Sequence, residues 1–289
     1  MIWDTIFQPF AEFGFMRRAL LGCIAISVGA TPVGTFLMLR RMSLTGDAMA
    51  HAILPGAAVG FLVFGLSLIP MTIGGLTAGL LVALLSGFVT RMTILREDAS
   101  LAAFYLISLA IGVLIVSTRG SNVDLMHVLF GTVLALDDAT LILLCAISSF
   151  SLITLSLLFR PLVLECADPQ FFRSVSGLSA ITHFTFLLLV VLNLVGGFHA
   201  IGTLMAVGVM ILPATSARFW AISIGGMIAT AVAIAMISSL IGLLLSFYYS
   251  LPSGPAIILV NGIVYGLSVF LGPIGGLLTQ TINQQQLKF

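Results

Sequence analysis

The chain has 289 residues, of which 60% are hydrophobic and only 7% are charged, and its formal net charge is +1. Soluble domains are about half apolar and a quarter charged, so this composition excludes an ordinary soluble protein. A near-neutral chain also gives no reason to expect a nucleic-acid partner. Several runs reach or approach about 18 residues almost without charge, and the alternating ten-residue segments of a barrel are absent. We therefore expect an all-α polytopic membrane protein, embedded in a lipid bilayer.

The motifs of the common enzyme classes are missing from the sequence. It contains no zinc-protease motif, no nucleophile elbow and no phosphate-binding loop. The three cysteines, Cys23, Cys145 and Cys166, lie in or beside apolar runs and lack CxxC spacing, which predicts packing residues. No hydrophilic stretch is long enough for a separate catalytic domain. We expect a single transmembrane domain over residues 1–289 that is not itself an enzyme, so that any ATP is hydrolysed by another chain.

The apolar stretches predict about eight or nine transmembrane helices. Residues 1–16, which are rich in aromatic side chains, are expected to form an interfacial N-terminal segment, and residues 278–289 a polar C-terminal tail. The sixth and seventh stretches are short enough to be half-helices, and Gly196–His199 is expected to form a tight reversal between them. Residues 118–138 are too polar to span and long enough for a short interfacial helix. The nine expected spans cover residues 17–39, 47–66, 70–90, 99–117, 139–159, 181–197, 200–219, 221–247 and 255–277.

The basic residues predict the orientation of the chain. Nine spans put the two termini on opposite sides, and loops rich in Lys and Arg stay in the cytoplasm. With the connections at 40–46, 91–98 and 160–180, the turn at Arg218 and the C-terminus inside, eight basic residues lie inside and three outside. We therefore expect the N-terminus outside and the C-terminus in the cytoplasm. The inner group is Arg40, Arg41, Arg91, Arg96, Arg160, Arg173, Arg218 and Lys288, and the outer group is Arg17, Arg18 and Arg119.

Two ionisable residues, Asp47 and His51, lie at the start of the second expected span. In a helix, a spacing of four residues puts both side chains on one face with about 6 Å of rise between them. Ionisable groups inside a membrane are costly and usually face a pathway or a partner. Carboxylate oxygen and imidazole nitrogen suit zinc, manganese and ferrous iron. Two ligands are too few for a closed site, so the pair is either an incomplete transport site or a structural lock.

The remaining histidines are weaker candidates. His199 stands at the expected outer reversal, where it fits a secondary metal ligand at the mouth of a pathway or an ordinary polar turn residue. His127 follows Asp124 by three residues in the outer polar segment, and this pair can attract a cation or remain a hydrated loop pair. His183 begins the sixth span and is expected to be interfacial.

The largest polar segment of the second half is residues 160–180. Asp168 can cap a short helix whose first position is Pro169, and Gly177 can end that helix. A capped helix of about eight residues outside the membrane fits either a docking element or an ordinary loop helix.

Motifs along nearly the whole chain resemble the membrane permease of metal-type ABC importers, the uptake systems for zinc, manganese and iron. Residues 40–56, with the sequence RRMSLTGDAMAHAILPG, resemble the family signature. In the same order, residues 9–20, 168–177, 201–218 and 251–255 resemble the family's N-terminal start, coupling segment, late helix and last loop. The one departure is Cys166-Ala167, where more polar residues are expected.

The resemblance implies a type II ABC importer permease fold, similar to that of the vitamin B12 and siderophore importers. It implies a homodimer in the bacterial cytoplasmic (inner) membrane, two cytoplasmic ATP-binding-cassette subunits that use ATP, and an extracytoplasmic solute-binding protein. No permanently bound cofactor is implied; the zinc, manganese or ferrous ion is cargo, coordinated by Asp47 and His51. The residues implied to couple the permease to the ATPase, within a cytoplasmic segment at 160–180, are Asp168, Pro169, Phe171, Phe172, Arg173 and Gly177.

Two other classes of function remain open at this point. One is an ion-coupled secondary metal transporter or channel without an ATPase, which uses the same pair of side chains. The other is a membrane scaffold in which Asp47 and His51 only lock a helix. The segment at 160–180 favours the ABC importer over both, because neither alternative needs a docking helix.

Overall fold

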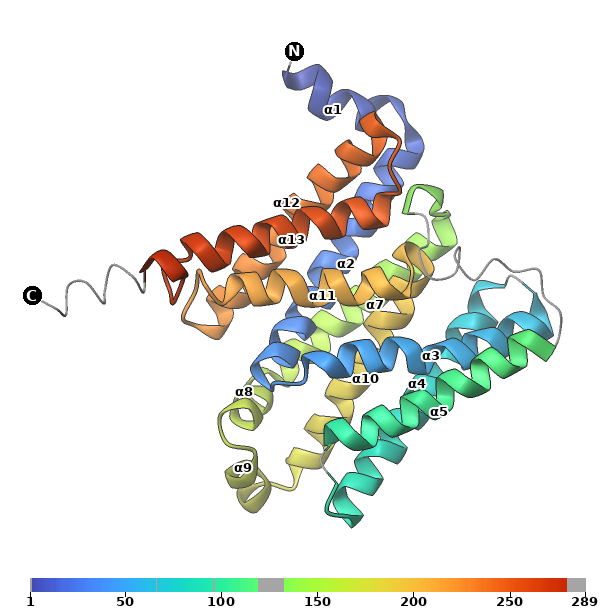
Figure 1. Cartoon of the computed structure of the whole chain (residues 1–289), viewed down its shortest axis with the longest axis vertical. Helices are drawn as coiled ribbons and strands as arrows, with labels where there is room; N and C mark the ends of the chain where they lie inside the picture. The colour runs from blue at the N-terminus through green and yellow to red at the C-terminus, as the bar shows by residue number, and fades with distance from the viewer. Residues whose placement is uncertain (1, 66, 96, 119–132, 280–289) are drawn as a thin grey trace, which may run out of the picture.

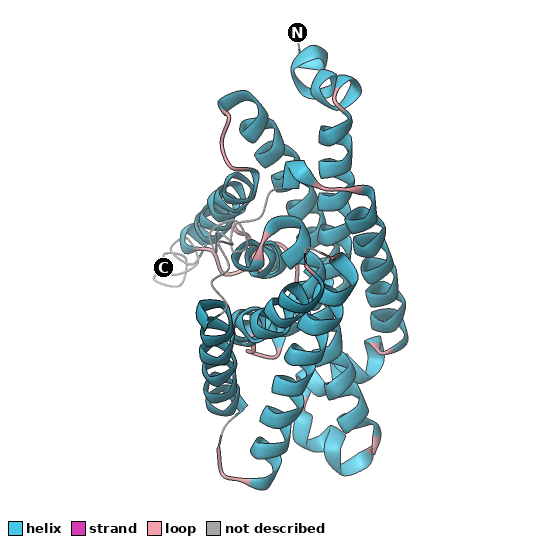
Figure 2. Ribbon diagram, turned by 90° about the vertical axis from the view of Figure 1, so that its right-hand side faces the viewer, coloured by secondary structure: helices cyan, strands magenta, loops and turns pink. Residues whose placement is uncertain are grey.

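The computed structural model describes residues 2–65, 67–95, 97–118 and 133–279, and this part of the chain consists of helices and connections without a strand (Figures 1 and 2). The elements in chain order are α1 (Ile2–Glu12), α2 (Gly14–Leu39), α3 (Ser43–Phe64), α4 (Leu68–Met92), α5 (Glu97–Thr118), the 3-10 turn η1 (Val133–Ala135), α7 (Asp138–Leu157), α8 (Phe159–Ala167), α9 (Pro169–Val175), α10 (Leu178–Ile201), α11 (Thr203–Ala217), α12 (Ile224–Tyr249) and α13 (Ser253–Leu271).

All nine predicted spans correspond to helices. Eight described helices are long and apolar enough to cross a membrane, and α11 is a shorter apolar helix of 15 residues. The second span begins earlier than predicted, at Ser43 and not at residue 47, so Asp47 lies inside the helix and not at its first turn. The expected interfacial helix within 118–138 falls mainly on residues outside the described part.

The core lies around α2 and α10. In the most apolar 18-residue window of each helix, 78% of α2 and 61% of α10 is buried, against 22% of α4 and 17% of α5. A helix that is apolar all round and still exposed in a single chain fits a lipid environment, where apolar side chains need no cover. The helices α2 and α10 therefore form the centre of the bundle, and α4 and α5 its outer wall.

The predicted reversal at Gly196–His199 is wrong. Helix α10 continues to Ile201, and the chain turns at Gly202, whose φ of 83° is readily adopted only by glycine. Gly196 and Gly197 lie inside the helix, where a Cβ on Gly197 would lie 2.5 Å from the Cβ of Ala206 on α11. The paired glycines therefore allow two helices to approach each other closely, a common use of glycine in membranes, and do not form a turn.

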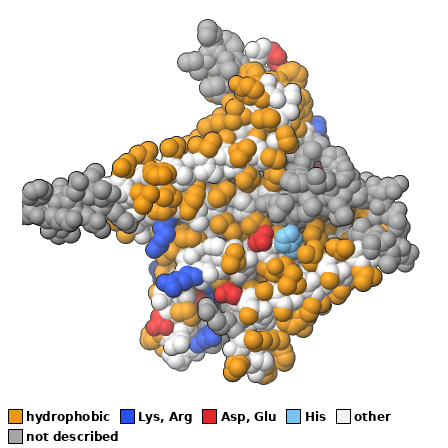
Figure 3. All heavy atoms as spheres, in the orientation of Figure 1, with side chains coloured by type: hydrophobic (Ala, Val, Ile, Leu, Met, Phe, Trp, Pro, Cys, Tyr) orange, Lys and Arg blue, Asp and Glu red, His pale blue; other side chains and the backbone are white. Residues whose placement is uncertain are grey.

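The cationic side chains gather at one end of the bundle. In Figure 1, α8, α9 and the last turn of α2 lie at the lower left, the last turns of α11 lie at the left at mid-height, and α1 lies at the top. Figure 3 shows Lys and Arg side chains on the same lower left of an otherwise mostly hydrophobic face. We call this region the basic end, and its described arginines are Arg40, Arg41, Arg160, Arg173 and Arg218. The gathering agrees with the predicted inner side, and the orientation itself stays a prediction.

Candidate metal site and coupling segment

Helix α3 carries Asp47 and His51 on one face, as their spacing predicts. The distance from Asp47 Oδ1 to His51 Nε2 is 3.8 Å, and the side chains are 53% and 24% exposed. The imidazole stacks on the ring of Tyr105 from α5, with centroids 6.2 Å apart. His51 Nδ1 is buried and has no hydrogen-bond partner among the described residues. The carboxylate is therefore open to a ligand, while the imidazole is held by a neighbouring ring.

The sequence around the pair fixes the position of α3. Gly46 lets the first turn of α3 approach α11, because a Cβ there would lie 3.1 Å from Met210 Cε. Ser108 of α5 donates a hydrogen bond of 3.1 Å to the carbonyl of Ala52. Pro55 lies inside α3 and has no N–H, so the carbonyl of His51 loses its usual helical donor. Helix α3 thus has one backbone oxygen, that of His51, without its usual helical hydrogen bond.

One chain does not complete a metal site. Among the residues that the structure describes, no group of three or more His, Cys, Asp or Glu side chains is placed to hold a metal ion. A metal ion at Asp47 and His51 would therefore need further donors from carbonyls, water or another chain, in line with the count of two ligands.

The predicted coupling segment at 160–180 consists mainly of two short helices, α8 and α9. Asp168 caps α9, accepting hydrogen bonds from the N–H groups of Gln170 at 3.0 Å and Phe171 at 2.9 Å, with Pro169 at the first helical position. The predicted cap is confirmed. Helix α9 ends at Val175 with Ser176 as its C-cap, and Gly177 follows directly, as predicted for the end of the helix. Its φ of −65° is that of an ordinary residue, so Gly177 does not form the left-handed cap that favours glycine. Helix α8 was not expected. It has only nine residues, and its few polar side chains are interspersed with apolar ones.

The two phenylalanines of α9 differ in exposure. Phe171 is 57% exposed, and Phe172 is 5% exposed and contributes to the core. Arg173 and Gly177 line a hollow of about 330 Å³ beside this helix, together with Ser176, Ser179 and Ala180. An exposed aromatic ring next to a polar hollow is the kind of surface that receives a partner protein.

Cys166, the departure from the family pattern, is partly buried at the end of α8. Burial raises the pKa of its thiol to about 11. The side chain therefore stays a neutral packing group at physiological pH, as its sequence context predicts.

The other predicted ligands lie apart from the pair or outside the described residues. His199 lies in the last turn of α10, where its Nδ1 lies 2.9 Å from the carbonyl oxygen of Val195. His127 and Asp124 fall on residues outside the described part. His183 lies near the start of α10 and its side chain is buried within the protein, and its expected position at the membrane interface stays a prediction.

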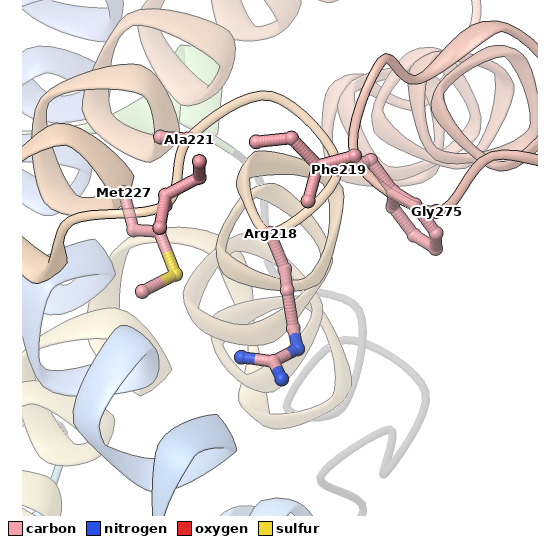
Figure 4. A pocket seen from close by; sticks show the side chains of 7 residues that line it. Arg218, Phe219, Ala221, Met227 and Gly275 are labelled. Carbon is pink, nitrogen blue, oxygen red and sulfur yellow. The ribbon is translucent and has the colours of Figure 1, made fainter. Parts of the chain in front are cut away.

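A larger hollow, of about 380 Å³, lies at the basic end and shares no residue with the pair (Figure 4). Its walls come from the turn between α11 and α12, the first turns of α12 and the segment after α13. The lining residues are Arg218, Phe219, Ala221, Ile222, Met227, Ile274 and Gly275.

Two features of the site were missed by the sequence analysis. Tyr105 stacks on His51, and a buried cluster of Arg40, Glu165 and His183 joins three helices at the basic end. Arg40 is 125 residues from Glu165 and 143 from His183, so no local spacing reveals the contact. The one available signal was Glu165, an acidic residue within the apolar stretch of α8.

Comparisons with known proteins agree with this architecture. The family model described as the ABC 3 transport family matches residues 12–272. The manganese import system permease protein ScaB of Streptococcus parasanguinis is 32% identical over 262 residues, which cover 91% of this chain and 92% of that protein. A probable iron transport system membrane protein of Haemophilus influenzae is 30% identical over 269 residues, covering 93% and 97%.

A solved structure has the same fold. The structure of PsaBC from Streptococcus pneumoniae in complex with Fab matches with a TM-score of 0.84 and 28% identity, over 100% of both chains. The family match extends over most of the sequence, and the structural match includes every span. This chain belongs to the ABC 3 transport family and is a multi-pass permease with a type II importer fold.

Proposed function

We propose that this chain forms the translocation path of an ATP-driven importer of manganese or ferrous iron. The observation that carries the proposal is the Asp47–His51 pair, a half-exposed carboxylate beside an imidazole on the membrane-spanning helix α3. Oxygen and nitrogen donors suit these ions, and the family relatives named above are manganese and iron transport proteins. The metal ion is the cargo, and the site has to release it as well as bind it.

The incomplete donor set supports a homodimer. A carboxylate that is 53% exposed on an apolar helix is unfavourable against lipid, so a second copy of the chain or a water-filled pathway has to cover it. Two copies facing each other would supply two carboxylates and two imidazoles. Four such donors form a sufficient site, and separation of the copies would release the ion.

The ATPase partner belongs at the basic end. Helix α9 offers Phe171 to solvent and is anchored from behind by Phe172, so a push on the exposed ring would move the whole helix. We propose that two cytoplasmic ATP-binding-cassette subunits bind α9 and that an extracytoplasmic binding protein delivers the ion to the opposite end. Nucleotide binding would then switch the pathway between outward and inward access.

Metal uptake into liposomes tests the function. We expect the permease, reconstituted with its ATPase and binding protein, to take up manganese or ferrous iron only with ATP, measured by mass spectrometry of the washed liposomes. Liposomes holding the permease without the ATPase are the control. Uptake driven by an ion gradient in those control liposomes would contradict the proposal and favour a secondary transporter.

The two phenylalanines of α9 separate coupling from stability. Phe171→Ala should leave the thermal midpoint of the permease unchanged, because the exposed ring contributes little to folding. It should weaken ATPase binding, because the same ring is the part of α9 that we propose the ATPase contacts. Phe172→Ala removes a buried ring and should cost about 3–5 kcal/mol of stability. Co-purification of the ATPase and thermal unfolding of the permease alone measure the two effects.

Gly177→Ala is a second coupling variant that leaves the backbone unstrained, since nothing lies within 4 Å of a Cβ at this position. We expect it to reduce transport relative to ATP hydrolysis, because the added methyl group enters the hollow that Gly177 lines beside α9. Normal coupled transport in both Phe171→Ala and Gly177→Ala would refute the role of α9.

A further inference from the structure

A buried cluster of three polar side chains joins the helices at the basic end. Arg40 Nη2 lies 3.1 Å from Glu165 Oε1 and 2.8 Å from His183 Nδ1, and His183 Nδ1 lies 3.7 Å from the same glutamate oxygen. The three side chains are 9%, 1% and 7% exposed. The guanidinium also lies over the ring of Phe186, 4.9 Å from its centroid. We call Arg40, Glu165 and His183 the Arg40 cluster.

The chemistry of the cluster points to a role besides stability. A buried ion pair is weak support for a fold, because desolvation of the charges offsets most of their attraction. Arg40 Nη1 and Glu165 Oε2 are buried and have no hydrogen-bond partner among the described residues. The three side chains therefore bond to one another, but some of their hydrogen-bonding groups remain without a partner. Such groups are costly in an apolar interior. An apolar pair of similar volume would pack the same space at least as stably.

On one side, the cluster leads to the coupling helix. Glu165 lies in α8, and α8 ends at Ala167, directly before Asp168, whose carboxylate caps α9. Phe171, the exposed ring of α9, is one helical turn further on. A displacement of α9 by a bound partner therefore pulls on the helix that holds Glu165.

On the other side, the cluster leads to the metal pair. Arg40 ends α2, and the N–H groups of Arg41 and Met42 bond back to carbonyls of its last turn at 3.1 and 2.9 Å, with a left-handed φ of 58° at Arg41. This is the hydrogen-bond pattern of a Schellman turn. Helix α3 begins at Ser43, and Asp47 follows about one turn later. Because the turn is short and internally bonded, a movement of Arg40 is passed to the start of α3.

We propose that Arg40, Glu165 and His183 are positioning residues that transmit the movement of the coupling helix to the Asp47–His51 pair. Arg40 connects α8 with the α2–α3 turn, and His183 ties both to α10, one of the two central helices of the bundle. The inference rests on the proposed function, since it presumes an ATPase that acts on α9. A purely structural role for the cluster predicts a different result. If the cluster transmits movement, a variant that lacks it but still folds stably should hydrolyse ATP and fail to transport metal.

The double variant Arg40→Met/Glu165→Met tests the inference. It replaces the buried ion pair by apolar side chains, a change that preserves or raises stability in comparable cases. We expect the complex to assemble with its usual thermal midpoint and to keep its ATPase activity, while the metal transported per ATP falls by about tenfold. Uptake and ATP hydrolysis are measured in the same liposomes, with the ATPase and binding protein present.

Two further variants keep the test decisive. Glu165→Gln keeps the shape of the side chain and removes its charge, and we expect it to lower metal transported per ATP in the same direction. Asp138→Asn is the matched control, because that carboxylate is exposed, pairs with Arg18 and lies outside both the cluster and the segment at 160–180. An unchanged ratio of metal to ATP in the assembled double variant and in Glu165→Gln would overturn the inference and leave the proposed function standing. Absence of uptake by the unmodified complex would overturn both.

Discussion

Replacing Asp47 or His51 by alanine should reduce metal uptake by about 100-fold or more while the complex still assembles. Loss of even an outer-shell partner of a metal ligand typically costs about 10–100-fold in affinity, and loss of a direct donor should cost at least as much. The fold should tolerate the change, because Asp47 is half exposed and its contact with His51, at 3.8 Å, contributes little. A large loss of transport without loss of assembly identifies a binding site and not a structural lock.

The measurement is uptake of manganese and of ferrous iron by the reconstituted complex, together with the thermal midpoint and the yield of each variant. Asp138→Asn is the matched control, because that carboxylate is 75% exposed, pairs with Arg18 at 2.9 Å and lies at the start of α7. His51→Gln keeps most of the bulk beside Tyr105 and separates loss of a ligand from loss of packing. Uptake at the unmodified rate in both alanine variants would remove Asp47 and His51 from the pathway.

Placing a side chain at Gly34 or Gly56 should prevent the bundle from packing. A Cβ on Gly34 would overlap the carbonyl oxygen of Met210 on α11, and one on Gly56 would overlap the carbonyl oxygen of Gly74 on α4. Backbone atoms cannot move aside as a flexible side chain can, so the helices have to separate. We expect Gly34→Val and Gly56→Val each to destabilise the fold by more than about 3 kcal/mol, above the usual cost of overpacking.

The yield of monodisperse permease and its thermal midpoint in detergent measure this effect. Gly262→Ala in α13 is the control, because nothing lies within 4 Å of a Cβ at that position. It should fold normally, with the slight gain that alanine gives over glycine in a helix. Normal folding of Gly34→Val would show that α2 and α11 are further apart than the structure has them.

The common face of Asp47 and His51 follows from the sequence alone, because helical periodicity is local and needs no knowledge of the fold. The same locality explains where the predictions fail. Gly196-Gly197 has the composition of a turn, but in a bundle of membrane helices glycine also permits close contact, and only the neighbouring Ala206 shows which use applies. Gly177 does follow the C-cap of α9 as predicted, yet its φ of −65° is not the left-handed conformation that favours glycine at a helix end.

Local sequence patterns do not predict which residues from other helices contact Asp47 and His51. Tyr105 stacks on His51 from a different helix, 54 positions along the chain. The sequence around either residue does not predict this contact. The Arg40 cluster joins residues more than 120 positions apart. Such contacts depend on how α2, α8 and α10 pack together, and pairwise spacing carries no information about that packing.

By itself, the sequence determined the apolar spans, the common face of Asp47 and His51 and the cap of α9 by Asp168. Each depends on hydrophobicity, helical repeat or a hydrogen bond between near neighbours, which are properties of short stretches. Only the tertiary structure decided which carboxylate is open and which polar groups are buried together. Asp47 is 53% exposed and Glu165 is 1% exposed, although both are single acids within apolar runs. Burial depends on the helices that pack against each residue, and those come from distant parts of the chain.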